Sequence, residues 1–247
     1  MPFRSRRSVL ALACLAVAGC GVNWSDDSRT PGGRPGPVVR DKVVIEKEKA
    51  ARAELVQVDL TMGAGELDVR GGAAGLLEAE FAYNIPSWKP EVRYDDSSFR
   101  GRLSIRQPKG DTTIGDVKNE WKLRLANSIP LDIAVRCGAG ENRLDLRDLK
   151  LRSVEIHLGA GTVDLDLRGK PEKDYDVSIH GGVGEATVRV PSAAGVVAEA
   201  RGGIGSIEVR GMKKDGSRWV NDAYGKSKTT IRLDVKGGIG QINIFGG

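Results

Sequence analysis

The fold is decided by the segment Val154-Glu155-Ile156-His157-Leu158-Gly159-Ala160-Gly161-Thr162-Val163-Asp164-Leu165. Apolar and polar residues alternate on both sides of its central Gly-Ala-Gly. This alternation is typical of a β-strand with one buried face and one solvated face. The segment therefore predicts a strand, a tight glycine turn and a second strand.

The pattern occurs six times in the 247-residue chain. The first glycines of the six copies are Gly63, Gly138, Gly159, Gly182, Gly203 and Gly238. Successive first glycines are 75, 21, 23, 21 and 35 residues apart, so the first and last intervals contain insertions. A regular repeat of this length indicates an architecture in which each unit stacks on its neighbours.

Three apolar columns appear when the copies are aligned on these glycines. Five positions before the glycine stand Val58, Ile133, Val154, Val177, Ala198 and Leu233. Three positions before it stand Leu60, Val135, Ile156, Ile179, Ala200 and Val235, and six positions after it stand Val69, Leu144, Leu165, Val188, Val209 and Ile244. One repeat cannot bury its own apolar face, whereas stacked repeats join these columns into a continuous core. We therefore expect an all-β stack of Gly-x-Gly repeats.

The glycines could also suggest a phosphate-binding loop. That function needs a helix N-terminus after the glycines, whereas strand-like alternation follows here and no Lys-Ser or Lys-Thr comes after the motif. We interpret the glycines as positions of positive φ or of close backbone approach.

Two insertions interrupt the repeats. Residues 73–130 contain strand-like segments at 77–83, 90–94, 102–105 and 121–125, which predict an antiparallel extension toward the N-terminal end of the stack. Residues 212–229 predict a long loop or hairpin before the last repeat. Near the start of the domain, residues 41–45 favour a strand, whereas residues 46–54 could be helical.

The N-terminus has the features of a signal peptide over residues 1–19. Arg4, Arg6 and Arg7 precede an uncharged apolar run from Val9 to Gly19, which is shorter than the roughly 20 residues that span a bilayer. The run ends in Leu15-Ala16-Val17-Ala18-Gly19-Cys20, which resembles the lipobox of bacterial lipoproteins. The resemblance implies cleavage between Gly19 and Cys20 and attachment of lipid to Cys20. An ordinary signal peptide that happens to contain a cysteine is the alternative.

Residues 20–40 would then be the lipidated cysteine and a flexible linker rich in Gly, Pro, Ser and Asp. We expect the protein in the cell envelope, lipid-anchored on the extracytoplasmic side, with the choice of inner or outer membrane and of Sec or Tat export left open. Residues 41–137 and 138–247 are expected to form two regions of one continuous domain.

Charge and cysteine content exclude several functions. The chain has 38 basic and 33 acidic residues, but three arginines belong to the signal peptide, so the mature chain has 35 against 33, a net charge of +2. This balance gives no support to a nucleic-acid partner. Removal of Cys14 with the signal peptide and acylation of Cys20 leave only Cys137, which allows no internal disulfide. Its position predicts an inert thiol that points inward.

The polar column two residues before each glycine contains Thr61, Arg136, His157, His180, Arg201 and Lys236. Two residues earlier stand Asp59, Ala134, Glu155, Ser178, Glu199 and Asp234. His157, His180 and Glu155 could hold a metal, although zinc needs three or four fixed ligands and the neighbouring arginines repel cations. The column could also bind anions, or it could be a solvated face of paired charges. Trp219 and Tyr224 either contact a partner or cap the stack. We expect no catalytic residue, metal or cofactor.

The chain resembles the bacterial toast-rack domain, which is related to the C-terminal part of LiaF-type envelope stress regulators. The resemblance rests on Asn119-Glu120-Trp121-Lys122-Leu123, Ile129-Pro130-Leu131-Asp132-Ile133, Cys137-Gly138-Ala139-Gly140-Glu141 and Leu158-Gly159-Ala160-Gly161. It covers roughly residues 50–247 and implies a right-handed β-solenoid-like stack that binds or senses at the cell envelope. The family has no catalytic residues to transfer.

Together these features predict a membrane-anchored, non-catalytic binding or scaffold module, with a role in envelope stress sensing. Its partners would be the membrane, through the lipid, and an envelope protein or cell-wall polymer. A structural spacer or adhesin-like module is one alternative. A polysaccharide-acting enzyme is the other, and it would require a cluster of carboxylates with raised pKa in a groove.

Overall fold

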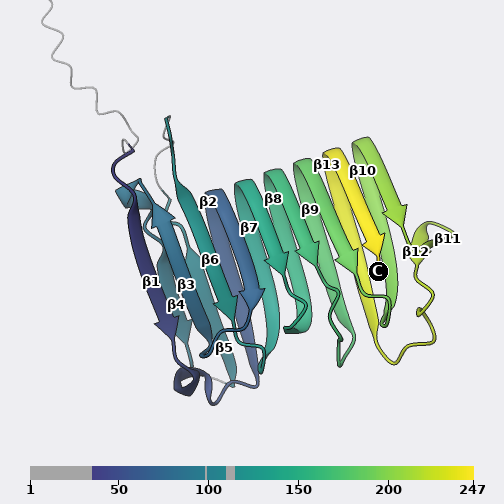
Figure 1. Cartoon of the computed structure of the whole chain (residues 1–247), viewed down its shortest axis with the longest axis horizontal. Coiled ribbons are helices and arrows are strands. Elements are labelled where there is room, and N and C mark those ends of the chain that lie inside the picture. The colour runs from purple at the N-terminus through teal and green to yellow at the C-terminus, as the bar shows by residue number, and fades with distance from the viewer. Residues whose placement is uncertain (1–34, 98, 110–114) are drawn as a thin grey trace, which may run out of the picture. The chain divides into compact units, whose positions relative to one another are not determined.

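The computed structural model describes residues 35–97, 99–109 and 115–247. The predicted signal peptide, with the expected cleavage site at Gly19 and Cys20, lies outside these residues. All thirteen described strands belong to one open sheet, whose main path runs β1-β3-β6-β2-β7-β8-β9-β13-β10-β12-β11 (Figure 1). The prediction of an all-β stack is therefore confirmed.

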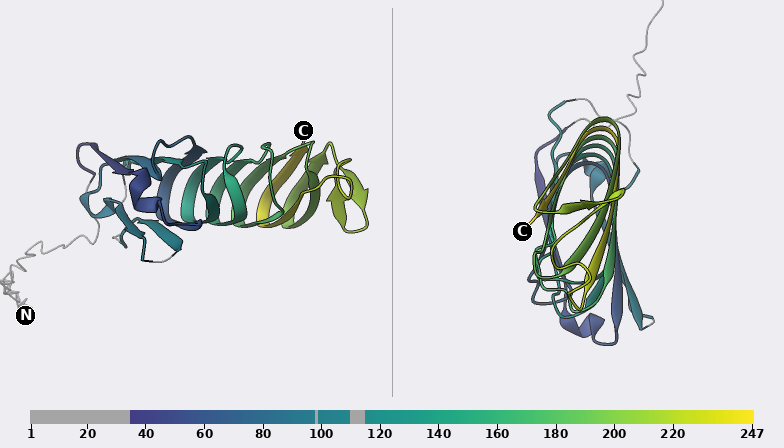
Figure 2. Two further views of the ribbon diagram at one scale, coloured as in Figure 1. Left: turned by 90° about the horizontal axis from the view of Figure 1, so that it is seen from below. Right: turned by 90° about the vertical axis from the view of Figure 1, so that its right-hand side faces the viewer.

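Six long strands form the repeats. They are β2 (Leu55–Gly71), β7 (Pro130–Asp145), β8 (Lys150–Asp166), β9 (Tyr175–Val190), β10 (Gly195–Arg210) and β13 (Thr230–Gly246). Each strand bends at its Gly-x-Gly, so that a first arm and a second arm face each other, as the end-on view of Figure 2 shows. We call one such bent strand a rung.

The bend is part of the strand and does not separate two strands. Neighbouring rungs remain paired in parallel through it, for example at Ala139–Ala160 and Gly140–Gly161. This differs from the prediction of strand, turn and strand. The reason is that parallel pairing continues around the corner, so the backbone polar groups of the bend are satisfied by adjacent rungs.

The second glycine of each motif is required by the backbone. Gly161 has a φ of +122°, and a Cβ atom there would lie closer than 3.0 Å to the carbonyl oxygen of Gly140 on the neighbouring rung. The same close approach recurs from rung to rung along the stack. The interpretation of these glycines as positions of positive φ and close approach is therefore confirmed.

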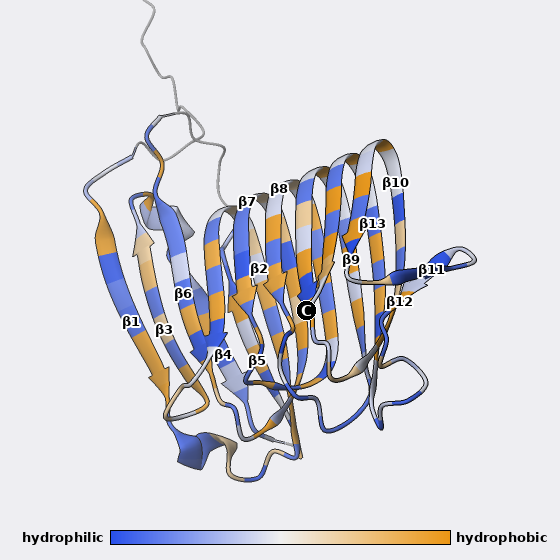
Figure 3. Cartoon of the chain, turned by 45° about the vertical axis from the view of Figure 1, so that its right-hand side comes forward, coloured by the Kyte–Doolittle hydropathy of each residue, from blue (hydrophilic) through white to orange (hydrophobic). Residues whose placement is uncertain are grey.

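The core lies between the two arms. Val154, Ile156 and Leu165 on β8 are at most 1% exposed, and the other rungs bury the matching residues of the three apolar columns. Figure 3 shows the alternation as hydrophobic and hydrophilic bands along each rung. Val209 on β10 is the exception, since it is only partly buried.

The rungs do not stack in sequence order at the C-terminal end. β13 lies between β9 and β10 and pairs in parallel with both (Figure 1). The repeat pattern alone predicts β10 beside β9. The connection over residues 211–229 is long enough for the last rung to return and insert there, whereas the four-residue connection 146–149 places β8 directly beside β7.

The first insertion forms the predicted antiparallel extension. β1 (Val39–Ile45), β3 (Leu77–Tyr83) and β6 (Asn119–Leu125) pair in an antiparallel ladder, and β6 joins it to the second arm of β2. β4 (Glu91–Asp95) and β5 (Arg100–Arg106) form a hairpin on the first arm of β2.

The described helices are two short 3₁₀ turns, η1 (Lys47–Ala50) and η2 (Pro86–Trp88). Residues 46–54 therefore contain one turn of 3₁₀-helix rather than a longer helix. Among the described residues, no helix has the length and apolar character needed to cross a bilayer.

The second insertion forms a hairpin at the C-terminal end of the stack, as predicted. β11 (Lys213–Asp215) pairs with β12 (Arg218–Val220), and β12 pairs with the first arm of β10 at Val197 and Ala198. We call residues 212–229 the terminal hairpin.

Candidate functional site

The first arms present two parallel rows of polar side chains to solvent. The basic row, in spatial order, is Thr61, Arg136, His157, His180, Lys236 and Arg201. The acidic row beside it is Asp59, Ala134, Glu155, Ser178, Asp234 and Glu199. Sequence order would place Arg201 beside His180, but Lys236 takes that place because β13 is inserted between β9 and β10.

Most of the basic row is paired with the acidic row. Arg136 lies 3.7 Å from Asp59, and Lys236 lies 2.8 Å from Asp234. Arg201 pairs in the same way with Glu199. Exposed pairs of this kind contribute about 0–1 kcal/mol each, so these rows form a solvated face of matched charges with little free positive charge for an anion.

The two histidines stack on adjacent rungs, with ring centroids 5.0 Å apart. The Nε2 atom of His157 lies 2.5 Å from a Glu155 oxygen, and this hydrogen bond holds the pKa of Glu155 below its usual value. The described residues contain no group of three or more His, Cys, Asp or Glu side chains placed to hold a metal ion. The two stacked rings and the Glu155 carboxylate are thus not arranged to hold a metal together, whereas zinc needs three or four ligands in fixed positions.

A groove of about 620 Å³ runs beside these rows, and Tyr224 lines it. Its four carboxylates belong to Glu155, Asp176, Glu199 and Asp234. Each lies beside a cation or an imidazole, and for Asp176 the partner is Arg232 at 3.2 Å. A glycosidase needs one carboxyl group that stays protonated near neutral pH. All four carboxylates of this groove are instead held in contact with neighbouring cations or an imidazole, so the groove presents paired charges to a ligand.

The two aromatic residues of the terminal hairpin have different surroundings. Trp219 pairs with Ala198 on β10 and packs, partly buried, against the hydrophobic core. Tyr224 lies under the guanidinium group of Arg218, 5.8 Å from ring centroid to carbon. Trp219 thus helps to cap the first arm of β10, which is the last rung of the stack. Tyr224 lies at the edge of a groove, where a partner could contact it.

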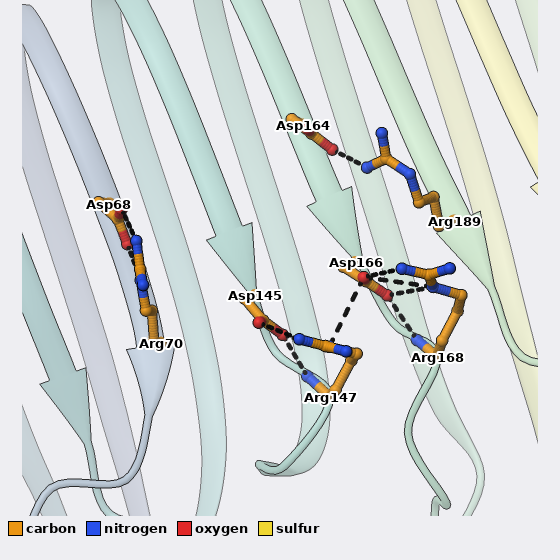
Figure 4. Close-up of polar contacts among 8 residues, drawn as sticks. All are labelled: Asp68, Arg70, Asp145, Arg147, Asp164, Asp166, Arg168 and Arg189. Carbon is orange, nitrogen blue, oxygen red and sulfur yellow. Dashed lines mark hydrogen bonds and ion pairs between the residues drawn. The ribbon is translucent and has the colours of Figure 1, made fainter.

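The second arms carry a charge ladder of their own, shown in Figure 4. Arg147 pairs with Asp145 at 2.6 Å and also lies 3.6 Å from Asp166 on the next rung. Asp166 in turn pairs with Arg168 at 2.7 Å. The hydrogen bond from Arg147 is the largest cause of a lowered pKa at Asp145.

Sequence reasoning missed this ladder. Its signal is the recurring triplet Asp-apolar-Arg at Asp68–Arg70, Asp145–Arg147 and Asp166–Arg168. Both charged residues of such a triplet face the same side of a strand, because side chains alternate with period two.

The Asn119-Glu120-Trp121 segment closes the N-terminal end of the glycine ladder. Gly63 donates its backbone N–H to the side-chain oxygen of Gln107 at 2.9 Å. Asn119 donates to the carbonyl oxygen of Ala64 at 2.6 Å and to Gln107 at 3.0 Å, and Trp121 donates to Asn119. These buried side chains thus hydrogen-bond the backbone of the first bend, where no further Gly-x-Gly rung follows.

Cys137 and Asn142 lie inside the stack. Cys137 is 4% exposed, and burial raises the pKa of its thiol, which disfavours the nucleophilic thiolate. Asn142 donates from its side chain to the carbonyl oxygen of Thr162 on the next rung at 3.2 Å. The amide thereby satisfies a backbone group near the bend.

A second groove, of about 750 Å³, lies along the loops that join the rungs. We call it the loop groove; its lining includes residues 127, 128, 130, 146–152, 167, 169–173 and 175 together with Phe99. Arg152, Lys170 and Lys173 line it, and within the described residues none of these three has a carboxylate within 4.0 Å. Phe99 at its edge is 72% exposed. The groove therefore combines these three cations and an aromatic ring with the carboxylates of Glu54, Asp148 and Glu172, of which Glu172 pairs with Lys150 at 3.5 Å.

Known proteins show the same fold. The chain matches the family described as the N-terminal domain of toast_rack, DUF2154, over residues 34–189. It is 31% identical to a "putative cell adhesion protein" from Clostridium sporogenes, with a TM-score of 0.80 over 85% of this chain and 100% of that one. No curated protein matches the chain.

Two further solved structures are more distant. A Bacteroides fragilis structure described as a "putative adhesin" is 12% identical over 86% of this chain and 100% of its own, with a TM-score of 0.32. A Parabacteroides distasonis structure described as lipid-binding is 10% identical over 85% and 98%, with a TM-score of 0.27. Scores this low carry no argument about function. The bent-rung stack, its glycine ladder and the match over residues 34–189 together show that the chain belongs to the toast-rack family.

Proposed function

We propose that this toast-rack protein is a lipid-anchored binding module of the cell envelope that holds an anionic cell-wall polymer in the loop groove. A non-catalytic binding or adhesin-like role fits the family and the Clostridium sporogenes structure. The anchor at Cys20 and the anionic ligand are the parts that we add.

We infer an anionic ligand from the unpaired positive charges in the loop groove. Along the rows and ladders of both arms, arginine and lysine side chains are matched to carboxylates on the same or the next rung. Arg152, Lys170 and Lys173 depart from this pattern. A cation without an intramolecular partner is the natural contact for an external anion, and several in one groove suit a polymer with repeated negative charges.

The test measures binding of the full chain to purified anionic wall polymer by sedimentation, at two salt concentrations. We expect the triple variant Arg152→Glu, Lys170→Glu, Lys173→Glu to lose most of its binding, because each change replaces attraction by repulsion. The matched control carries Lys214→Glu, Lys226→Glu and Lys228→Glu, the same change in net charge on the terminal hairpin. Equal losses in both variants would show a net-charge effect and would contradict the assignment to the groove.

The anchor has a separate test. Cys20→Ser removes the thiol that would accept the lipid, so we expect the protein to move from the membrane fraction to the soluble fraction while its circular dichroism spectrum keeps its β character. A Cys14→Ser variant is the control, since that residue lies within the predicted signal peptide. Retention of the Cys20→Ser protein in membranes would refute the lipid anchor and leave the groove assignment untouched.

A further inference from the structure

The C-terminal end of the stack is only half covered. Residues 195–198 of β10 contact the terminal hairpin, through pairing with β12 and hydrogen bonds with Asn221 and Thr229. From Glu199 to Arg210, β10 pairs with β13 on one side, and no described strand pairs with its other edge. Figure 2 shows the hairpin crossing this end below the bend, which it leaves uncovered.

Residues that other rungs bury are exposed here. Ile207 of β10 is 39% exposed, whereas Leu67, Val163 and Ile242 at the same position of other rungs are at most 4% exposed. The N-terminal end of the stack lacks this opening, because β6 covers the second arm of β2 and Gln107 and Asn119 close its bend. An uncovered edge of this kind is normally blunted by charged side chains, especially lysine, by proline or by a bulge. Residues 199–210 contain neither lysine nor proline, and their four charged residues, Glu199, Arg201, Glu208 and Arg210, flank an uncharged segment at 202–207.

In the last three rungs the bend carries its large side chain on the outside, whereas in the first three rungs the large side chain is on the inside. The residue before the first glycine is Met62, Cys137 or Leu158 in β2, β7 and β8, but glycine in β9, β13 and β10, at Gly181, Gly237 and Gly202. The residue inside the motif changes from Ala64, Ala139 and Ala160 to Val183, Ile239 and Ile204. The three large residues are at least 51% exposed and lie side by side on adjacent rungs.

The missing side chains leave an apolar pocket of about 80 Å³ under the bend of these three rungs. Ile179, Ala186, Ile207 and Ile242 are among its lining residues. The backbone does not require glycine at Gly181, since a Cβ atom there would have no neighbour closer than 3.9 Å. Glycine inside a strand weakens it, and often marks a place where a ligand or another backbone comes close.

We propose that the free second arm of β10 binds one extended segment of another protein by β-strand addition, with an apolar side chain of that segment entering the pocket. The edge from Ile204 to Arg210 supplies main-chain hydrogen bonds, as its other edge already does for β13. Ile204 and Ile207 supply apolar contact on the two faces of the added strand.

The occupant is a single strand rather than a second stack. The terminal hairpin projects beyond β10 at the same end of the molecule (Figure 2), so another stack of rungs cannot approach the full edge. One extended segment needs only the roughly 4.8 Å of the next strand position. The added strand would continue the ladder that already joins β13 to β10.

The probe for this site is a fluorescent peptide with the sequence of residues 201–210, Arg-Gly-Gly-Ile-Gly-Ser-Ile-Glu-Val-Arg. It carries the repeat pattern that each rung presents to the next. Binding to the full chain is measured by fluorescence anisotropy, with a scrambled peptide as the control. We expect saturable binding of the repeat peptide and none of the scrambled one.

Two variants locate the binding. Ile204→Asp removes the exposed apolar contact, and Gly202→Leu fills the pocket, where a Cβ atom meets nothing closer than 3.7 Å. We expect each to weaken binding about tenfold or more. Ala160→Asp is the matched control, because Ala160 is exposed at the same motif position but lies on β8, three rungs away from the edge and outside the pocket lining, and we expect it to bind as the wild type does.

Three outcomes would overturn the proposal. The first is no binding of the repeat peptide by wild type, and the second is an equal loss from Ala160→Asp and Ile204→Asp. The third is a stable dimer of the wild type in analytical ultracentrifugation that Ile204→Asp dissociates, since a second copy would then occupy the edge. None of these outcomes bears on polymer binding in the loop groove.

Discussion

Replacing either of two glycines on adjacent rungs by alanine should have opposite effects on stability. Gly161 on β8 has a φ of +122°, and a Cβ atom there would lie closer than 3.0 Å to the Gly140 carbonyl oxygen. Gly181 on β9 has no positive φ, and its nearest neighbour to a new Cβ atom is 3.9 Å away. Both substitutions add one methyl group, so the chemistry of the change is the same.

The expected magnitudes follow from these surroundings. For Gly161→Ala, the backbone conformation costs about 1–3 kcal/mol. The rungs must also separate, which weakens one or two ladder hydrogen bonds at about 1 kcal/mol each. The total loss is about 3 kcal/mol or more. For Gly181→Ala, reduced freedom of the unfolded chain contributes about 0.4–1 kcal/mol of added stability.

Urea denaturation followed by circular dichroism measures the free energy of unfolding for both variants and the wild type. For a domain of this size, a loss of 3 kcal/mol corresponds to a fall in Tm of about 6–12 °C, so thermal unfolding gives a second reading. Equal destabilisation by the two substitutions would refute the close-approach reasoning. It would mean that glycine matters at both positions for a reason common to them, such as strand flexibility.

Two further predictions concern register and charge. Ile156→Asp places a carboxylate in the core, where Ile156 is fully buried, and should unfold the domain. Glu155→Ala removes an exposed side chain and should lower the free energy of unfolding by less than about 1 kcal/mol. Comparable losses of stability in urea denaturation would show that the register is wrong. Arg147→Gln should lower stability more at pH 7 than near pH 2, because the pKa of Asp145 is lowered in the folded state. The contribution of the Asp145 carboxylate to stability is present above its unfolded pKa and disappears as the pH falls through its folded pKa. A constant difference in stability between variant and wild type across that range would contradict this prediction.

The periodic part of the fold follows from local sequence. Each inward residue, such as Ile156, is identified by its distance from a glycine, because the strand period and the bend are both local properties. The segments 77–83 and 121–125 of the extension were predictable for the same reason. The bend was expected as a turn, since whether parallel pairing continues through it depends on neighbouring rungs.

The order of the last rungs could not be read from the sequence. β13 matches β9 and β10 equally well in pattern, and only the length of the connection before it allows insertion between them. The residues of the candidate sites were likewise only partly predictable from the sequence. The rows containing Arg136 and His157 were predictable, whereas the loop groove around Arg152, Lys170 and Lys173 joins loops whose spatial relation no repeat encodes.

Because β13 is inserted between β9 and β10, the complete sheet can form only after β13 has been synthesised. β10 is synthesised before β13, and in the complete sheet the facing edges of β9 and β10 both pair with β13. A product that stops short by one rung therefore carries two open edges and an exposed core, which are the features that chaperones and proteases recognise. A chain that has closed its sheet has, by that fact, been translated through β13.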